Sequence, residues 1–225
     1  MYSILCSKID VSIDKIIDKI KKYVKENAYT VILPWAFPKE LDTEKFEEEY
    51  FKKGERRYNK YLNELKKLGI KEENFNVVNV YDITREALEE QIDKADIIVL
   101  PGGNPEMFYN KVQEIGIQQK LRSYKGLIIG ESAGAVLHLH KYFLTEENNF
   151  YGYFAYYNGF GLIRDIFEID VHTIDNDEYI NKLKKIANEK QKTVYAIMDD
   201  GAILVNRENN NVEILNDTKE ILCSK

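Results

Sequence analysis

A serine between two glycines is the residue with the clearest chemical potential in this sequence. Ser132 lies in GESAGA (130–135), which joins the apolar run 126–130 to a helix-forming run. A G-x-S-x-G motif between a strand and a helix is typical of a nucleophile elbow, a sharp turn that projects the serine hydroxyl from the sheet edge. The same spacing can also serve only as a tight turn, so the motif alone leaves both interpretations open.

Backbone N–H groups beside the serine could stabilise an oxyanion. Ala133 starts the following helix, and helix N-termini favour negative charge. Gly102 and Gly103 directly follow the neighbouring apolar run 96–101. They lie at the C-terminal end of that expected strand, where parallel sheets place their ligands. Glycine allows a backbone N–H to approach a reacting carbonyl, so Gly102 or Gly103 could supply the second donor. The segment is also good turn and helix-cap sequence.

A serine with an ordinary pKa needs a general base, and the chain contains only three histidines. His138 and His140 follow the serine on the same predicted helix, which carries them away from the elbow. His172 follows an apparent strand, 165–171, at a position where loops converge on an active site. We therefore expect His172 to be the general base.

The base needs a carboxylate that fixes its tautomer and stabilises the imidazolium. Glu146 and Glu147 lie between Ser132 and His172, which gives the order Ser, acid, His found with nucleophile elbows. Further candidates for the acid are Asp165, Asp170 and Asp175.

The elements that position these residues follow a βαβα order. Short apolar runs at 2–6, 30–34, 75–81, 96–101 and 126–130 alternate with charged segments of helical period. This order predicts an α/β fold, a three-layer sandwich with a mostly parallel central sheet. Helices are expected over 11–27 and 177–189, and over 39–68 either one helix or two broken near Gly54.

The second half of the chain predicts less regular structure. The aromatic stretch from Phe150 to Phe160 is interpreted as a lid or pocket wall, with hydrophobic packing as the alternative. The C-terminal part predicts two or three strands, with 199–201 and 208–211 as turns. These strands are expected to join the same mixed sheet.

Composition narrows the class of protein. A chain of 225 residues that is 44% hydrophobic predicts one globular domain over 1–225. The net charge of −6 argues against nucleic acid as a partner, and the lack of a long apolar run predicts no membrane partner and a cytoplasmic location. Cys6 and Cys223 form no zinc or disulfide pattern, so we expect reduced thiols, no metal and no organic cofactor. A small peptide is the expected partner, and a homodimer is left open.

Three segments together resemble the dipeptidase E and cyanophycinase family of serine peptidases, whose fold is similar to that of class I glutamine amidotransferases. The segments are PGGNPEMFY (101–109), GESAGA (130–135) and DVHTID (170–175). The resemblance implies Ser132 as nucleophile and His172 as base, with Gly103 and Ala133 as oxyanion donors. It selects Glu147, fifteen residues after the serine, as the acid.

The expected function is therefore a serine hydrolase that cleaves a small peptide amide through an acyl-enzyme. Asn104 and Arg164 are candidate substrate contacts, Arg164 because it is the nearest guanidinium before His172. The segment after His172 is short and acidic, which predicts weak activity on an N-terminal aspartate. The alternatives are a hydrolase of another amide or ester, or a noncatalytic binding or sensor protein. Glutamine amidotransfer is disfavoured because it uses a cysteine at the elbow.

Overall fold

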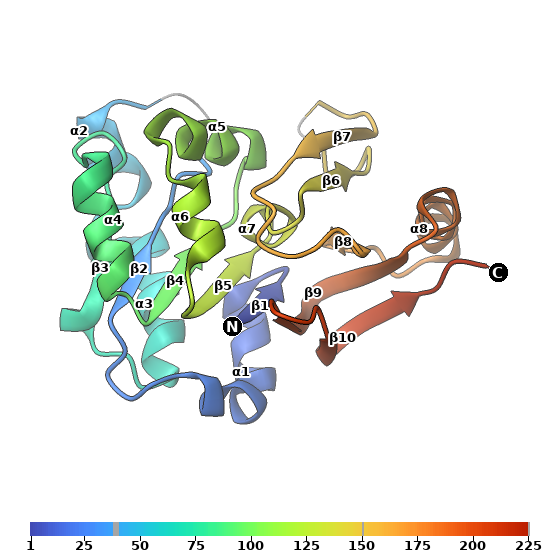
Figure 1. Cartoon of the computed structure of the whole chain (residues 1–225), viewed down its shortest axis with the longest axis horizontal. Helices are drawn as coiled ribbons and strands as arrows, with labels where there is room; N and C mark the ends of the chain where they lie inside the picture. The colour runs from blue at the N-terminus through green and yellow to red at the C-terminus, as the bar shows by residue number, and fades with distance from the viewer. Residues whose placement is uncertain (38–40, 150, 225) are drawn as a thin grey trace.

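The computed structural model describes residues 1–37, 41–149 and 151–224. Eight strands of this part form a central sheet in the order β10-β9-β1-β5-β4-β2-β3, and β8 pairs with β9 (Figure 1). The strands are β1 (Tyr2–Cys6), β2 (Thr30–Ile32), β3 (Phe75–Val77), β4 (Ile97–Leu100), β5 (Leu127–Glu131), β8 (Phe167–Val171), β9 (Thr193–Asn206) and β10 (Val212–Ile221). The first five are parallel, while β9 runs antiparallel to β1 and β10.

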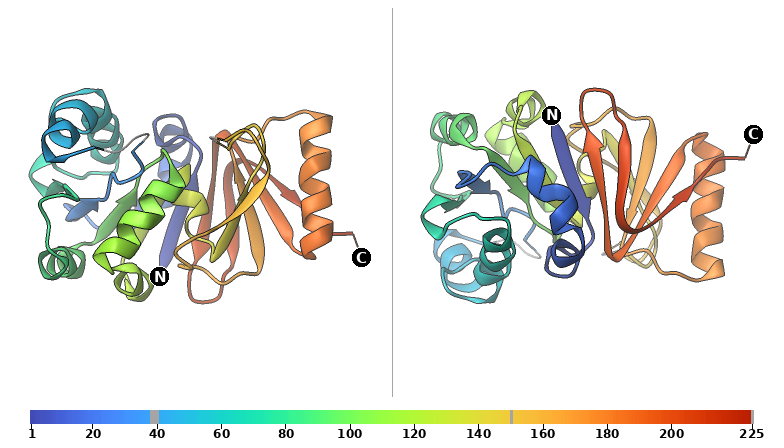
Figure 2. Two further views of the ribbon diagram at one scale, coloured as in Figure 1. Left: turned by 90° about the horizontal axis from the view of Figure 1, so that it is seen from above. Right: turned by 90° about the horizontal axis from the view of Figure 1, so that it is seen from below.

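Helices cover both faces of the sheet. They are α1 (Ile9–Ile20), α2 (Thr43–Lys45), α3 (Arg56–Lys67), α4 (Arg85–Lys94), α5 (Pro105–Ile115), α6 (Gln118–Ser123), α7 (Ala133–Val136) and α8 (Asp177–Lys190), with short 3-10 helices at Lys21–Tyr23 and Glu72–Asn74. Figure 2 shows α1 with α3 on one face and α4 with α5 and α6 on the other. The predicted α/β sandwich with a mostly parallel sheet is confirmed.

The parallel strands are apolar along their length because both faces are covered. Every residue of β4 is buried, and α1 buries Ile9, Ile13, Ile16 and Ile20 at a spacing of three to four residues. That spacing places the four isoleucines on one face of the helix, which packs against the sheet. The helix predicted over 11–27 thus begins and ends earlier than expected.

The charged segment after residue 40 forms two helical parts and not one. α2 continues into a π-helix, Phe46–Tyr50, and α3 starts at Arg56. Gly54 separates them with a φ of +85°, a left-handed conformation that glycine adopts readily. The predicted break near Gly54 is therefore present, while positions 39 and 40 of the predicted helix lie outside the described residues.

The strand β9 differs most from expectation. The predicted turn at 199–201 does not form, and β9 runs unbroken through it. Residues 193–197 pair with β8, residues 202–206 pair with β1, and β10 lies along the other side. β1 and β8 therefore lie end to end along one side of β9, and their C-terminal ends face each other.

A smaller hairpin, β6 (Lys141–Leu144) with β7 (Ala155–Asn158), lies beside α8 and the C-terminal strands (Figure 1). Phe143 of β6 packs with α8, β9 and β10 in a second apolar cluster. β7 contains part of the predicted aromatic lid, and Phe150 lies outside the described residues.

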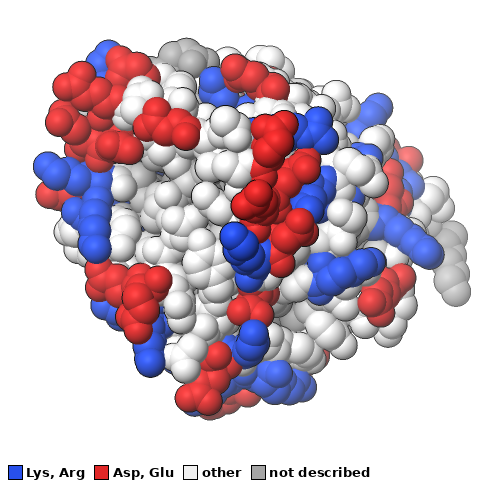
Figure 3. Space-filling view, turned by 60° about the vertical axis from the view of Figure 1, so that its left-hand side comes forward, with Lys and Arg blue, Asp and Glu red and all other residues white. Residues whose placement is uncertain are grey.

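Charged side chains of both signs are interspersed on the face shown in Figure 3. Ion pairs at the surface of the molecule include Arg85 with Glu89 and Lys66 with Glu72. None of the helices in the described ranges combines the length and the apolar character that a membrane crossing requires.

Candidate active site

Ser132 occupies a strained turn between β5 and α7. Its φ is +49° and its ψ is −109°, a conformation that costs a non-glycine residue about 1–3 kcal/mol. The backbone N–H of Ser132 donates to the carbonyl of Cys6 at the end of β1, at 2.9 Å. A Cβ on Gly134 would lie 1.9 Å from the carbonyl oxygen of Leu100, so only glycine allows α7 this close to β4.

His172 directly follows β8, and its side chain contacts Ser132, which directly follows β5. Its Nε2 lies 2.9 Å from Oγ of Ser132. The backbone N–H of His172 donates to Oγ of Ser7 at 2.9 Å, and the Ser7 hydroxyl donates to the carbonyl of Ile197 at 2.8 Å. Ser7 thus joins the ends of β1 and β8 to β9. The structure brings together the two residues that the sequence analysis paired.

Asp199 on β9 holds the other side of the imidazole. Its Oδ1 lies 2.9 Å from Nδ1 of His172, and its Oδ2 forms an ion pair with Lys8. Partial burial opposes ionisation of Asp199, but the hydrogen bonds from Lys8 and His172 outweigh it and lower the pKa of the carboxyl. An ionised carboxylate only accepts hydrogen bonds, so Nδ1 carries the proton and Nε2 of the neutral ring can accept from Ser132.

Glu147, the acid selected from the sequence, does not contact His172 among the described contacts. Its carboxylate forms an ion pair with Lys182 on α8, and this hydrogen bond lowers the pKa of Glu147. The contact with Nδ1 of His172 that was expected of Glu147 is made by Asp199 instead. The other predicted acids are also engaged elsewhere: Glu146 with Lys182, Asp165 with Lys192, Asp170 with Thr173 and Asp175 with Lys219.

Gly103 and Ala133 lie with Ser132 and His172 around one cavity of about 240 Å³. Neither backbone N–H of these two residues donates a hydrogen bond to any other described group. Gly103 has a φ of +140°, and a Cβ there would lie 1.9 Å from the carbonyl oxygen of Ala36. Glycine is therefore required, and both N–H groups remain available to a ligand oxygen.

Glu131, directly before Ser132, is a buried carboxylate that the sequence analysis did not single out. Its side chain is 3% exposed. Its oxygens accept from four groups: the N–H of Ile9 at 3.0 Å, Nζ of Lys60 at 2.6 Å, the hydroxyl of Tyr61, and the N–H of Gly102 at 3.3 Å. It therefore ties α1, α3 and the turn after β4 to the elbow.

Neither Asn104 nor Arg164, the candidate substrate contacts, is among the described residues that line the cavity beside Ser132. The side-chain oxygen of Asn104 caps α5 by accepting from the N–H groups of Glu106 and Met107. The backbone N–H of Arg164 donates to Oδ1 of Asn210, in the turn after β9. That turn follows Asn206, which pairs with Tyr2 at the N-terminal end of β1. Ser132 follows the C-terminal end of the parallel strand β5, so the backbone of Arg164 lies at the opposite ends of these strands.

The two remaining histidines lie outside this arrangement. His138 is buried, and desolvation lowers its pKa to about 3, so it stays neutral; its Nδ1 lies 2.7 Å from the carbonyl oxygen of Gly134. His140 is exposed. Across the described ranges, no three His, Cys, Asp or Glu side chains gather so that they could hold a metal ion.

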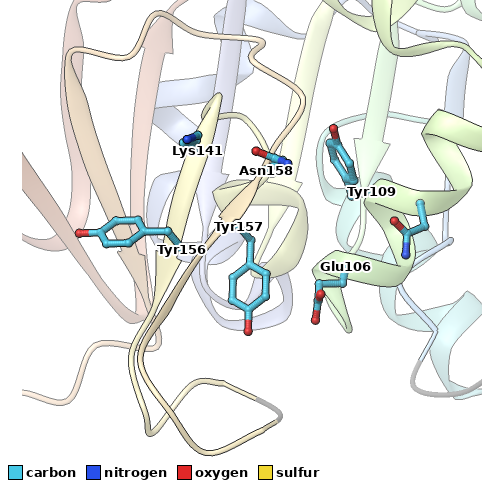
Figure 4. A pocket seen from close by; sticks show the side chains of 7 residues that line it. Glu106, Tyr109, Lys141, Tyr156, Tyr157 and Asn158 are labelled. Carbon is cyan, nitrogen blue, oxygen red and sulfur yellow. The ribbon is translucent and has the colours of Figure 1, made fainter.

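A second cavity of about 300 Å³ lies between α5 and the β6–β7 hairpin. Figure 4 shows Glu106 and Tyr109 on α5 facing Tyr157 and Asn158 on β7 across it. Pro105 lines the first cavity and Glu106 the second, so the start of α5 separates them. The predicted aromatic wall thus borders this second cavity.

Comparison with known proteins identifies similar sequences and folds. The sequence profile of the family described as Peptidase family S51 matches residues 14–213. The chain is similar to the structure of a candidate peptidase E from Listeria monocytogenes EGD-e, at 18% identity and a TM-score of 0.63 over 97% of this chain and 98% of that one. It is also similar to a peptidase from an acI-B1 Actinobacterium, at 15% identity and a TM-score of 0.51 over 100% and 95% of the two chains. No curated protein sequence matches significantly.

Proposed function

Because the chain belongs to peptidase family S51 and is a serine-type peptidase, we propose that it cleaves small peptide amides through an acyl-enzyme. Ser132 is the nucleophile, His172 the general base and Asp199 the carboxylate partner. The observation that carries the proposal is the continuous chain of two contacts, 2.9 Å from Ser132 Oγ to His172 Nε2 and 2.9 Å from His172 Nδ1 to Asp199.

The first step forms the acyl-enzyme. Oγ of Ser132 attacks the scissile carbonyl carbon while its proton passes to Nε2 of His172, and Asp199 stabilises the resulting imidazolium. The carbonyl oxygen becomes an oxyanion that accepts hydrogen bonds from the N–H groups of Gly103 and Ala133. The imidazolium then gives its proton to the amine nitrogen as the C–N bond breaks, which releases the amine.

The second step returns the enzyme to its starting state. Water attacks the ester carbonyl, His172 takes one proton from it, and the tetrahedral intermediate forms in the same oxyanion site. The imidazolium then returns the proton to Oγ of Ser132 as the ester bond breaks. The product carboxylic acid leaves.

Covalent labelling of the serine tests the proposal directly. A fluorophosphonate probe should modify Ser132 of the wild-type protein and no other serine, and Ser132→Ala should lose both labelling and dipeptide hydrolysis. Ser123→Ala is the matched control, because Ser123 lies exposed at the end of α6 with its hydroxyl donating to the carbonyl of Lys120. Equal turnover by Ser132→Ala and the wild-type protein would refute the assignment of the nucleophile.

A further inference from the structure

We propose that the 240 Å³ cavity beside Ser132 binds the side chain of the residue that supplies the scissile carbonyl, and that it selects small uncharged side chains over aspartate or glutamate. The inference rests on the proposed function and names the substrate class of the same site. The cavity adjoins Gly103, Ala133 and His172, so a carbonyl positioned for attack would place the neighbouring side chain within it.

The walls of this cavity are mainly apolar. They comprise Pro105, Val136, Leu144 and Val171, besides the polar residues of the proposed machinery and Asn148. None of the described residues that line the cavity is a lysine or an arginine. A volume of about 240 Å³ is below the range of drug-sized ligand sites, which suits a small side chain.

Asn148, which lines the cavity, uses its amide hydrogens in bonds to the protein. Its Nδ2 donates to the carbonyl of Val171 at 2.7 Å and to the hydroxyl of Tyr179 at 3.0 Å. The carbonyl of Val171 can only accept, so this contact fixes the orientation of the amide. Both amide hydrogens are then used, and Oδ1, which donates nothing, is the polar atom that remains for a ligand.

Two lysines that pair with residues near the site are held by carboxylates. Lys8 pairs with Asp199, and Lys182 pairs with Glu147. The carboxyl of Asp170 is buried directly behind Val171, where it accepts from Thr173 and Tyr179. A substrate carboxylate in the cavity would lose its hydration without gaining a cation from the described lining residues, which is unfavourable. An uncharged side chain avoids this cost.

A pair of isosteric dipeptides tests the inference on the wild-type protein. Asn-Leu and Asp-Leu differ only in replacing an amide by a carboxylate, so their kcat/KM ratio isolates the charge. We expect Asn-Leu, and Ala-Leu with it, to exceed Asp-Leu by at least about a hundredfold, which corresponds to about 2.7 kcal/mol of transition-state binding. An Asp-Leu value equal to or above that of Asn-Leu would overturn the inference.

A binding measurement separates failure of the inference from failure of the proposed function. Each dipeptide is also tested for protection of Ser132 against the fluorophosphonate probe, a readout that needs no turnover. Labelling of Ser132 with best protection by Asp-Leu would reject the selectivity and leave the nucleophile in place. Absence of labelling would reject the proposed function and the inference with it, and labelling without protection by any peptide would reject the inference alone.

A substitution in the cavity wall provides a second test. Leu144→Arg would add a cation, and Leu144→Gln is the matched uncharged control. We expect the ratio of Asp-Leu to Asn-Leu kcat/KM to rise at least tenfold in the arginine variant and to stay near the wild-type value in the control. Equal ratios in both variants, each shown to be folded by circular dichroism, would argue against Leu144 facing the bound side chain. Should the arginine variant not fold, the wild-type dipeptide series still decides.

Discussion

Ser132 and His172 share an unfavourable backbone conformation, with φ values of +49° and +54°. Such strain persists only where the surroundings hold it. Both residues are held from the same place: Cys6 accepts from the N–H of Ser132, and the next residue, Ser7, accepts from the N–H of His172. The end of β1 therefore fixes the distance between the proposed nucleophile and its base.

The choice between two carboxylates leads to a prediction about Asp199 and Glu147. Asp199→Asn should lower kcat on the order of 10²- to 10⁴-fold, because an amide no longer holds Nδ1 of His172 in the protonated tautomer or stabilises the imidazolium. Glu147→Gln should change kcat by less than about threefold, because Glu147 pairs with Lys182. Steady-state kinetics of both variants on one dipeptide would measure this. The reverse ranking would return the acid to the position expected from the sequence.

The sequence pointed to the two residues that the structure brings into contact, because the signal for each of them is local. Ser132 follows from a motif of a few residues, and His172 from its place at a strand end. Asp199 could not be found in this way, because it meets His172 only through the parallel pairing of β8 with β9, in which Val171 lies opposite Ile197. Asp199 lies two residues beyond the last pair of β8 with β9, and the sequence analysis assigned it to a turn at 199–201 instead of to β9.

At the scale of elements, Glu131 connects the elbow to the turn that carries the proposed oxyanion donor. Its carboxylate accepts from the N–H of Gly102, next to Gly103. Glu131→Gln would remove the charge that orders Lys60 and Tyr61 and would place amide hydrogens against donors. We expect kcat to fall about ten- to hundredfold with little change in KM, because the oxyanion donor would shift while substrate binding stays.

Asp10→Asn is the matched control for the Glu131 variant. Asp10 also pairs with Lys60, at 3.2 Å, but its partly exposed side chain is not among the described hydrogen-bond partners of the turn after β4, which are Tyr61 and Glu131. Its kcat should stay within about twofold of the wild-type value. A rise in KM without a fall in kcat for Glu131→Gln would contradict a role in positioning the oxyanion donor.

The helices and strands could be predicted where a single local sequence pattern determines them. They were harder to predict where tertiary contacts determine them. The isoleucine spacing predicted α1, and Gly54 predicted the break before α3. The acidic segment after His172 has a structural explanation that the sequence analysis did not consider. Asp177 and Glu178 lie in the first turn of α8, where acidic side chains interact favourably with the positive end of the helix dipole. The hypothesis about aspartate selectivity therefore rests on the walls of the cavity and not on these acids.

At the scale of the whole molecule, the end-to-end placement of β1 and β8 along β9 joins the parallel sheet to the C-terminal layer. Asp170, on β8, is buried at this junction with Thr173 and Tyr179. Burial raises the pKa of its carboxyl to about 7, although the hydrogen bonds from Thr173 and Tyr179 favour the ionised form. The folded protein thus binds this proton more tightly than the unfolded chain, whose aspartate has a pKa near 3.9.

This difference predicts how the stability depends on pH. Because the pKa of Asp170 is raised in the folded state, its contribution is fully present below about pH 4 and is lost as the pH rises to about 7, at roughly 1.4 kcal/mol per unit. Asp170→Asn, which has no proton to lose, should remove this part of the dependence. Urea denaturation at pH 4.5, 6.0 and 7.5 should show the variant gaining a few kcal/mol relative to the wild-type protein as the pH increases. A stability difference that is constant over this range would mean that Asp170 is already ionised in the folded protein at low pH, held by its hydrogen bonds to Thr173 and Tyr179.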